Sequence, residues 1–248
     1  GDILKACADA KLNQGQNFSR LMNYAMYGPK SPATNLLTEA ELASMNPQKL
    51  VDRIHNQNNY KHRILYYGPS SSKDLLATID QYHQVPATLK DIPAGNEFSY
   101  LETPATKVLV APYEAKQIYM AQISNLDKKY DPAIEPTREL YNEYFGGGMN
   151  SIVFQEMRET RGLAYSAWAG IMPPSYLKYP YTIRTQIATQ NDKMIDAVNT
   201  FNDIINNMPE SEAAFKLAKE GLINRMRTDR IIKSDIIWTY INAQDLGQ

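Results

Sequence analysis

The chain has 248 residues, of which 43% are hydrophobic and 21% are charged, and its formal net charge is -1. This balance is typical of a globular protein, and it argues against both a disordered chain and the basic excess of most nucleic-acid-binding proteins. The single cysteine, Cys7, excludes an intrachain disulfide and a multi-cysteine zinc site.

The first part of the chain is predicted to be mainly helical. Helical patterns cover residues 2–27 with an interruption at Gly15, a stretch that begins at Thr38, a stretch that begins at Pro47, and residues 70–83. Thr38 followed by Glu41 makes a capping box, in which each side chain satisfies a free backbone amide of the helix start. Asn46 before Pro47 is an equally typical beginning of a helix.

One strand is expected among these helices. The segment "HRILYYG", residues 62–68, combines β-branched and aromatic residues and ends at a Gly-Pro pair, which favours a buried strand. Residues 86–106 differ from their surroundings, because prolines and a glycine punctuate a stretch without sustained periodicity. We interpret 86–106 as a linker between residues 1–85 and residues 107–248.

The second part of the chain is predicted to be a sheet with helices. Strands are expected at 107–113, 116–124, 163–171 and 179–188, and helices at 131–145, 149–161, 191–207, 211–228 and 233–245. Adjacent pairs of strands beside runs of helices indicate an α+β fold, with an antiparallel-rich sheet and helices packed on one face.

Glycines interrupt the middle of this second part in "FGGGMNSIVFQEMRETRGLAYS". Gly146 to Gly148 follow a helix and lack the Lys and Ser/Thr of a phosphate loop, so a tight corner between two helices is favoured. In the following helix Met149, Val153 and Met157 recur at the spacing of one buried face. Gly162 is placed to end that helix in a left-handed conformation.

Arg158 and Tyr165 are the candidate site residues. Arg158 falls in the last turn of a predicted helix, where a cation suits the negative end of the helix dipole. Tyr165 lies near a strand start and fits a core position as well as a functional one. If Gly162 reverses the chain between them, the guanidinium and the phenol converge on one carbonyl oxygen or carboxylate. The pattern alone leaves the structural and the functional interpretation both open.

A catalytic metal site is not expected in this chain. Its three histidines, His55, His62 and His83, do not share a helical turn, and neither H-x-x-E-H nor H-E-x-x-H occurs. No apolar run approaches the roughly 20 residues of a membrane helix. We therefore expect a soluble protein, of the bacterial cytoplasm or periplasm, without a nucleic-acid or membrane partner.

The motif around Arg158 resembles the insulinase/pitrilysin family of zinc metallopeptidases, the inverzincins. The resemblance covers most of residues 20–230 and is most specific at 145–165, in the half that follows the metal-binding half of these enzymes. The matching positions are Phe154, Glu156, Arg158, Glu159, Gly162, Leu163, Ala164 and Tyr165. The family's zinc-binding H-x-x-E-H is absent.

The resemblance implies a fold like that of the mitochondrial processing peptidase and a role in binding substrate. Two such modules enclose a chamber, one carrying zinc and the general base, the other an Arg and a Tyr that contact the peptide. By position these are Arg158 and Tyr165, whereas Glu159 and Arg161 fit surface or capping roles. The implied partners are a zinc-binding module of the same or another chain and a peptide, and this chain alone is expected to be inactive and without a cofactor of its own.

The same resemblance implies that residues 1–85 end one module and residues 107–248 begin the next, which is truncated at its C-terminus. The strand and helix at 60–83 could then dock on the later sheet, within the chain or in a swapped homodimer. Two other functions stay open. One is a catalytically inactive assembly or scaffold module, and the other is a module that captures extended peptides along an exposed strand edge.

Overall fold

The computed structural model describes residues 2–174, 176–233 and 235–247, so Gly1, Ser175, Ser234 and Gln248 of the predicted segments lie outside the described residues. The chain divides into two compact units. Unit 1 takes in residues 1–108 and 231–242, and unit 2 takes in residues 109–230 and 243–248. The assignment of the chain to the end of one module and the beginning of another stays a prediction.

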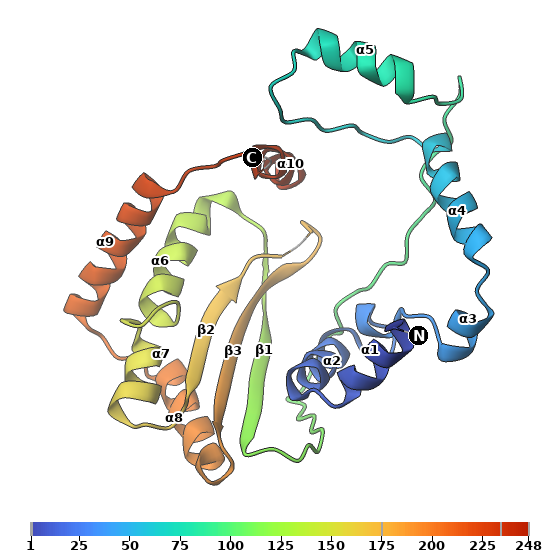
Figure 1. Cartoon of the computed structure of the whole chain (residues 1–248). Coiled ribbons are helices and arrows are strands. Elements are labelled where there is room, and N and C mark those ends of the chain that lie inside the picture. Colours follow the sequence, from blue (N-terminus) through green and yellow to red (C-terminus); the bar gives the residue numbers. More distant parts are fainter. Residues whose placement is uncertain (1, 175, 234, 248) are drawn as a thin grey trace. The chain divides into compact units, whose positions relative to one another are not determined.

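Unit 2 is built on an antiparallel sheet. Its described strands are β1 (Gln117–Lys129), β2 (Ser166–Met172) and β3 (Pro180–Gln190), in the order β1-β3-β2. The central β3 pairs antiparallel with both neighbours (Figure 1). The starts of β1 and β2 therefore lie beside the end of β3, at one end of the sheet. The predicted strands at 116–124, 163–171 and 179–188 are confirmed.

Helices cover one face of this sheet. They are α6 (Glu135–Phe145), α7 (Ile152–Phe154), the π-helical turn η4 (Gln155–Thr160), α8 (Met194–Asn206) and α9 (Glu212–Thr228), with short 3-10 turns η3 (Pro132–Ile134) and η5 (Asn191–Lys193). The sheet residues that enter the core are paired with one another across the three strands and so share one face of the sheet. Ile187 on β3, for example, pairs with Met120 on β1 and with Ala167 on β2. The predicted α+β class with helices on one face is confirmed.

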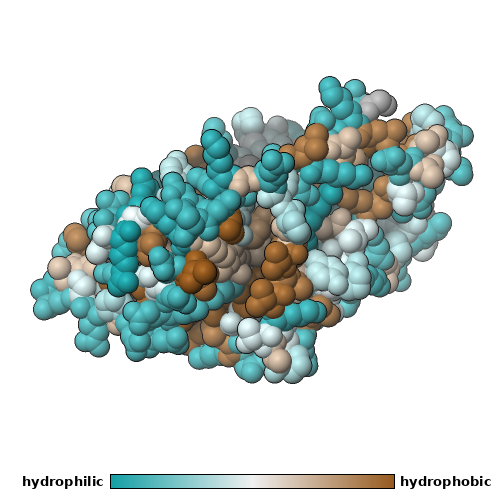
Figure 2. All heavy atoms as spheres, turned by 90° about the horizontal axis from the view of Figure 1, so that it is seen from below, coloured by the Kyte–Doolittle hydropathy of each residue, from teal (hydrophilic) through white to brown (hydrophobic). Residues whose placement is uncertain are grey.

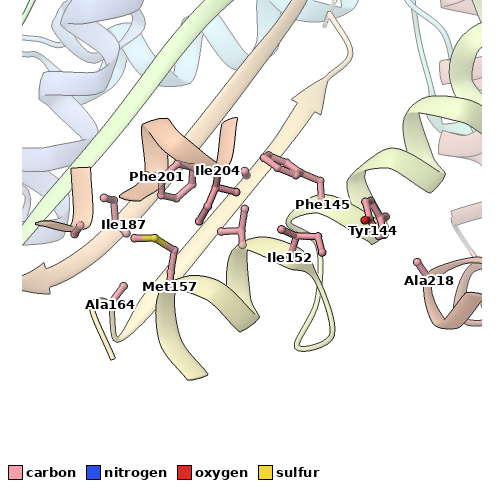
Figure 3. Packing of buried hydrophobic residues seen from close by; sticks show 12 residues of the cluster. Tyr144, Phe145, Ile152, Met157, Ala164, Ile187, Phe201, Ile204 and Ala218 are labelled. Carbon is pink, nitrogen blue, oxygen red and sulfur yellow. The ribbon is translucent and has the colours of Figure 1, made fainter. Parts of the chain in front are cut away.

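The core of unit 2 lies between that face and the helices. Met157 from η4, Ile187 from β3, and Phe201 and Ile204 from α8 point toward one another in Figure 3. Met157, Ile187 and Phe201 are completely buried. Burying each such side chain contributes roughly 1.5–3 kcal/mol, so this cluster fixes η4 and α8 against the sheet.

The glycine corner after α6 is confirmed, and its cause is a close backbone approach. Gly146 has a φ of -146°, which other residues also adopt, but a Cβ there would lie 2.3 Å from the carbonyl oxygen of Ala169 on β2. Gly162 has a φ of 57° and ends η4, as the left-handed cap predicted. Met149 was expected on the buried face and is 72% exposed, because the helix begins only at Ile152 after the Ser151 cap.

A partly buried polar cluster joins α6 to β3. Glu135 accepts hydrogen bonds from Arg138 Nη2 at 2.7 Å and from the Tyr181 hydroxyl at 2.6 Å. Burial raises the pKa of the Glu135 carboxyl, but these hydrogen bonds and the Arg138 charge outweigh burial and leave that pKa below its ordinary value. Burial, together with the same hydrogen bond to Glu135, raises the pKa of Tyr181 to about 12.

We expect acid to destabilise unit 2 through Glu135. Its pKa in the folded state is lower than the unfolded value of 4.5, so its stabilising contribution is complete above that value and is lost as the pH falls through the folded pKa. Glu135→Gln should lower the unfolding free energy at neutral pH and flatten its loss in acid, as measured by urea unfolding across that range. Glu139→Gln, which removes a half-exposed carboxylate 3.7 Å from Arg138, is the control. Equal acid losses in all three proteins would contradict the prediction.

Unit 1 is mostly helical in its described part. Its elements are α1 (Asp2–Lys11), α2 (Gln14–Tyr27), η1 (Pro32–Thr34), α3 (Glu39–Ser44), α4 (Pro47–Asn56), η2 (Gln57–Asn59), α5 (Ser72–Tyr82) and most of α10 (Asp235–Asp245). The predicted capping box is confirmed, with Glu41 accepting from the Thr38 amide at 2.7 Å and Thr38 accepting from the Glu41 amide. Residues of the predicted linker pack on α2, because the Leu101 amide donates to Met26 and the Tyr100 ring lies 5.0 Å from Tyr27.

Two predicted strands are wrong. Residues 62–68 and 107–113 form no strand and do not pair within the part of the chain that the structure describes. The closest feature is an isolated bridge between Tyr60 and Lys90. Their β-branched and aromatic residues favour extended backbone, but a strand also needs a neighbour to satisfy its amides. Ile64, Leu65 and Tyr67 are consequently exposed rather than buried.

The surface retains many large apolar side chains. Hydrophobic residues interrupt the hydrophilic surface in several places on the face drawn in Figure 2, and exposed apolar residues occur in both units. None of the helices among the described residues is both long and apolar enough to cross a bilayer.

Candidate functional site

Arg158 and Tyr165 lie at the end of the sheet where β1 and β2 begin and β3 finishes. Arg158 is in the last turn of η4, and the reversal at Gly162 leads directly to Tyr165, one residue before β2. The Tyr165 amide donates to the carbonyl oxygen of Ala188 on β3 at 2.9 Å. The backbone of both candidate residues is thus held by the fold, and a π-helical turn of this kind is frequent at functional sites.

The Arg158 guanidinium is held by two aromatic rings. Its Cζ lies 5.1 Å from the ring centre of Phe154 and 5.8 Å from that of Tyr165, distances at which a cation is attracted to a ring face. The Tyr165 side chain is nevertheless 73% exposed, so Tyr165 is not a core residue. The structure therefore brings together the guanidinium and the phenol that the sequence spacing suggested.

A pocket of about 290 Å³ opens beside this pair. Its lining combines strand ends, the end of η4 and the approach to α8, and consists of Gln117, Arg158, Gly162, Leu163, Ala164, Tyr165, Thr189, Gln190 and Lys193. Gln117 and Lys193 were not predicted, because they come from distant segments of the sequence that only the folded sheet brings together. Thr189 is fixed by donating to the carbonyl oxygen of Leu163 at 2.5 Å, which ties β3 to the segment after Gly162.

The pocket is electropositive. Arg158 and Lys193 both line it, and its lining includes no carboxylate. Lys193 Nζ donates to the carbonyl oxygen of Gly162 at 3.0 Å, which does not neutralise its charge. Arg158 meets Glu159 at 3.6 Å with both side chains about half exposed, a pairing that water screens strongly. Such a lining suits a carbonyl oxygen or a carboxylate of a ligand.

Comparison with protein families identifies the chain. The family model described as peptidase M16 inactive domain matches residues 63–222, which is well over half of the 248 residues. The chain belongs to the peptidase M16 inactive domain family. The resemblance to the insulinase-family portion that lacks the zinc motif is therefore confirmed. No curated protein matches the chain.

Solved structures share the fold of this M16 module. A peptidase M16 inactive domain from Pseudomonas fluorescens aligns at a TM-score of 0.57 and 20% identity, over 100% of this chain and 56% of that one. A conserved protein from Enterococcus faecalis aligns at 0.65 and 18%, over 100% and 58%. A protease from Helicobacter pylori aligns at 0.56 and 12%, over 85% and 52%. The chain thus spans little more than half of the length of these structures.

The described residues do not offer the ligands of catalytic zinc. Within the described ranges no three side chains of His, Cys, Asp or Glu gather closely enough to hold a metal ion. The family's zinc therefore does not fit the residues of this M16 module, and only binding roles are derived for them.

A second hollow, of about 360 Å³, lies along α6 and α9. Within its lining Arg225 binds Glu143 at 2.9 Å. Arg138 lies 3.7 Å from Glu139 of the same lining and binds Glu135, which lies outside it, at 2.7 Å. These pairs tie the two helices and the start of α6 in place. The hollow is accordingly explained by packing, whereas the cations of the Arg158 pocket are not paired in this way.

Proposed function

We propose that this M16 inactive domain is the substrate-binding part of a two-module zinc metalloendopeptidase, in which Arg158 and Tyr165 hold the peptide. The observation that supports this most is the half-exposed guanidinium of Arg158, which lies within cation–π distance of both the Phe154 and the Tyr165 ring and lines an electropositive pocket. An arginine needed only for the helix dipole would not require two rings to orient it.

The arrangement suits a peptide backbone. A guanidinium presents several N–H donors in one plane, and the phenol adds an O–H donor, so together they can hold one carbonyl oxygen or carboxylate. Because the rings already restrict Arg158, less side-chain entropy is lost when the ligand binds. Donors aimed at a carbonyl oxygen also stabilise negative charge that develops on it.

Zinc and its general base would come from a second module, in the same or a partner chain. When bound there, zinc supplies an activated water for attack on a peptide carbonyl. The residues of this chain would bind and orient the substrate opposite that module and would contribute no ligand to its catalytic zinc.

The test uses the complete two-module protein, its zinc content and an internally quenched fluorogenic peptide. Arg158→Ala should lower kcat/KM about 10- to 100-fold, the effect of losing a charged hydrogen-bond donor, and Tyr165→Phe about 3- to 10-fold. Zinc content should not change, because neither side chain binds zinc. Arg161→Ala is the matched control, since Arg161 is an equally exposed cation that pairs with Glu156 outside the pocket. Unchanged turnover in both pocket variants would refute the proposal.

One observation favours a second mode of peptide binding. β1 and β2 are both edge strands of the described sheet, and an edge presents free backbone groups to an extended peptide. In that case peptide binding would survive Arg158→Ala. Normal peptide binding without any turnover, in a complete protein that lacks zinc, would instead support the assembly or scaffold role.

A further inference from the structure

His62 and His83 meet face to edge in unit 1, although 21 residues separate them. Their Nε2 atoms lie 2.7 Å apart, and their rings are 4.8 Å apart between centroids and nearly perpendicular. His62 Nδ1 lies 2.6 Å from the carbonyl oxygen of Tyr60. Because a carbonyl oxygen only accepts, this Nδ1 carries the hydrogen, and neutral His62 turns the lone pair of Nε2 toward His83.

The backbones that carry the two rings are fixed. Beside His62, the Lys61 amide donates to Lys90 and the Lys90 amide donates to Asn59, each at 2.8 Å, and the side chain of Lys61 pairs with Asp91. His83 caps the C-terminal end of α5, where its amide donates to the carbonyl oxygen of Ile79 at 2.7 Å. Hydrogen bonds therefore join the two ends of the loop from residue 60 to residue 90, and His62 lies next to this closed end of the loop.

We propose that His62 and His83 form a binding site for a divalent transition metal ion, of the class of Zn²⁺, Ni²⁺ and Cu²⁺. Zinc lies about 2.0–2.1 Å from each imidazole nitrogen, so tetrahedral ligands are roughly 3.3 Å apart. The two Nε2 atoms need to separate by only a fraction of an ångström, and His62 is exposed and His83 only half-buried.

The contact at His62 Nδ1 supports this site. A metal-binding histidine usually donates its other ring hydrogen to a carbonyl or carboxylate oxygen, which fixes the tautomer and aims the free nitrogen. Tyr60 provides that carbonyl. The ion would take the place of the hydrogen between the two Nε2 atoms, which moves through solvent to Nδ1 of His83, so that both ligands are neutral imidazoles. Water would complete the coordination. Imidazole ligands prefer Cu²⁺, Ni²⁺ and Zn²⁺ over Mg²⁺ and Ca²⁺.

The test titrates the tag-free 248-residue chain with NiCl₂ and with ZnCl₂ by calorimetry. One ion should bind per chain, and His62→Ala and His83→Ala should each weaken binding at least about 10-fold. His55→Ala is the matched control, because His55 is the chain's third histidine and lies exposed on α4. MgCl₂ should give no binding.

A second measurement does not depend on the variants. In NMR spectra of the wild-type histidine side chains, Ni²⁺ should broaden the signals of His62 and His83 at concentrations that leave His55 sharp. Absence of metal binding by the wild-type chain would overturn the proposal. So would binding that persists in both His62→Ala and His83→Ala, or broadening of all three histidines together.

Discussion

Replacing Gly146 with alanine is expected to lower the unfolding free energy by about 3 kcal/mol, the cost of forcing an extra carbon into a packed site. The new Cβ would lie 2.3 Å from the carbonyl oxygen and 2.7 Å from the amide nitrogen of Ala169. Both are backbone atoms of β2, so no side chain can rotate away to make room. Either α6 or β2 must shift, and the shift would disturb the hydrogen bonds between Asn142 and Ile171.

Gly148, in the same run of three glycines, supplies the control. A Cβ at Gly148 meets nothing closer than the Glu143 carboxylate at 3.8 Å, so Gly148→Ala should change the unfolding free energy by less than about 0.5 kcal/mol. Urea unfolding followed by circular dichroism measures both variants. If both variants lost a similar amount of unfolding free energy, the glycines would be needed for their backbone freedom and not for the close approach of Gly146 to the backbone of Ala169.

This corner also shows how far the sequence alone can predict the fold. Three glycines after an amphipathic helix predict a corner, because glycine permits turns and close approach. The partner of Gly146 is Ala169, which lies 23 positions later on strand β2, and no local pattern identifies it. Helix caps such as Thr38 and Glu41 were predictable for the opposite reason, since all their atoms lie within one turn.

The two incorrectly predicted strands also show the difference between local and distant contacts. The residues of 62–68 have the β-favouring composition expected of a strand, yet strand formation depends on a neighbour that composition does not specify. The His62–His83 contact does not follow from the sequence for a related reason. Helical spacing brings two histidines together only within one turn, whereas here the pairing of Tyr60 with Lys90 closes the loop and the two rings meet across 21 residues.

The candidate site was half predictable. Arg158 and Tyr165 flank a single glycine reversal, so their convergence follows from local geometry, and the specific motif around them carries the family resemblance. Gln117 joins the pocket only because β1 pairs with β3, which places Gln117 opposite Gln190. Lys193 lies in η5, directly after β3, and no local pattern around Arg158 indicates that it lines the same pocket.

Met157 links the core to this site, and its replacement by alanine is expected to cost about 2–5 kcal/mol, the usual range for emptying a buried position. Its side chain is completely buried against Ile187 and Phe201 (Figure 3). Its carbonyl oxygen accepts from the amides of Leu163 at 2.8 Å and Ala164 at 3.2 Å, which fold the chain back toward Tyr165. A cavity here loosens the turn that positions Arg158.

Met157→Leu is the matched control, because leucine keeps nearly the same buried volume. It should lower the unfolding free energy by less than about 1.5 kcal/mol. Urea unfolding measures the stability of both variants, and peptide turnover by the complete protein, under conditions where each variant is fully folded, measures the site. Met157→Ala should then raise KM or lower kcat while Met157→Leu does neither, since a loosened η4 no longer holds the guanidinium against Phe154 and Tyr165. Unchanged unfolding of Met157→Ala would mean that this position does not anchor η4.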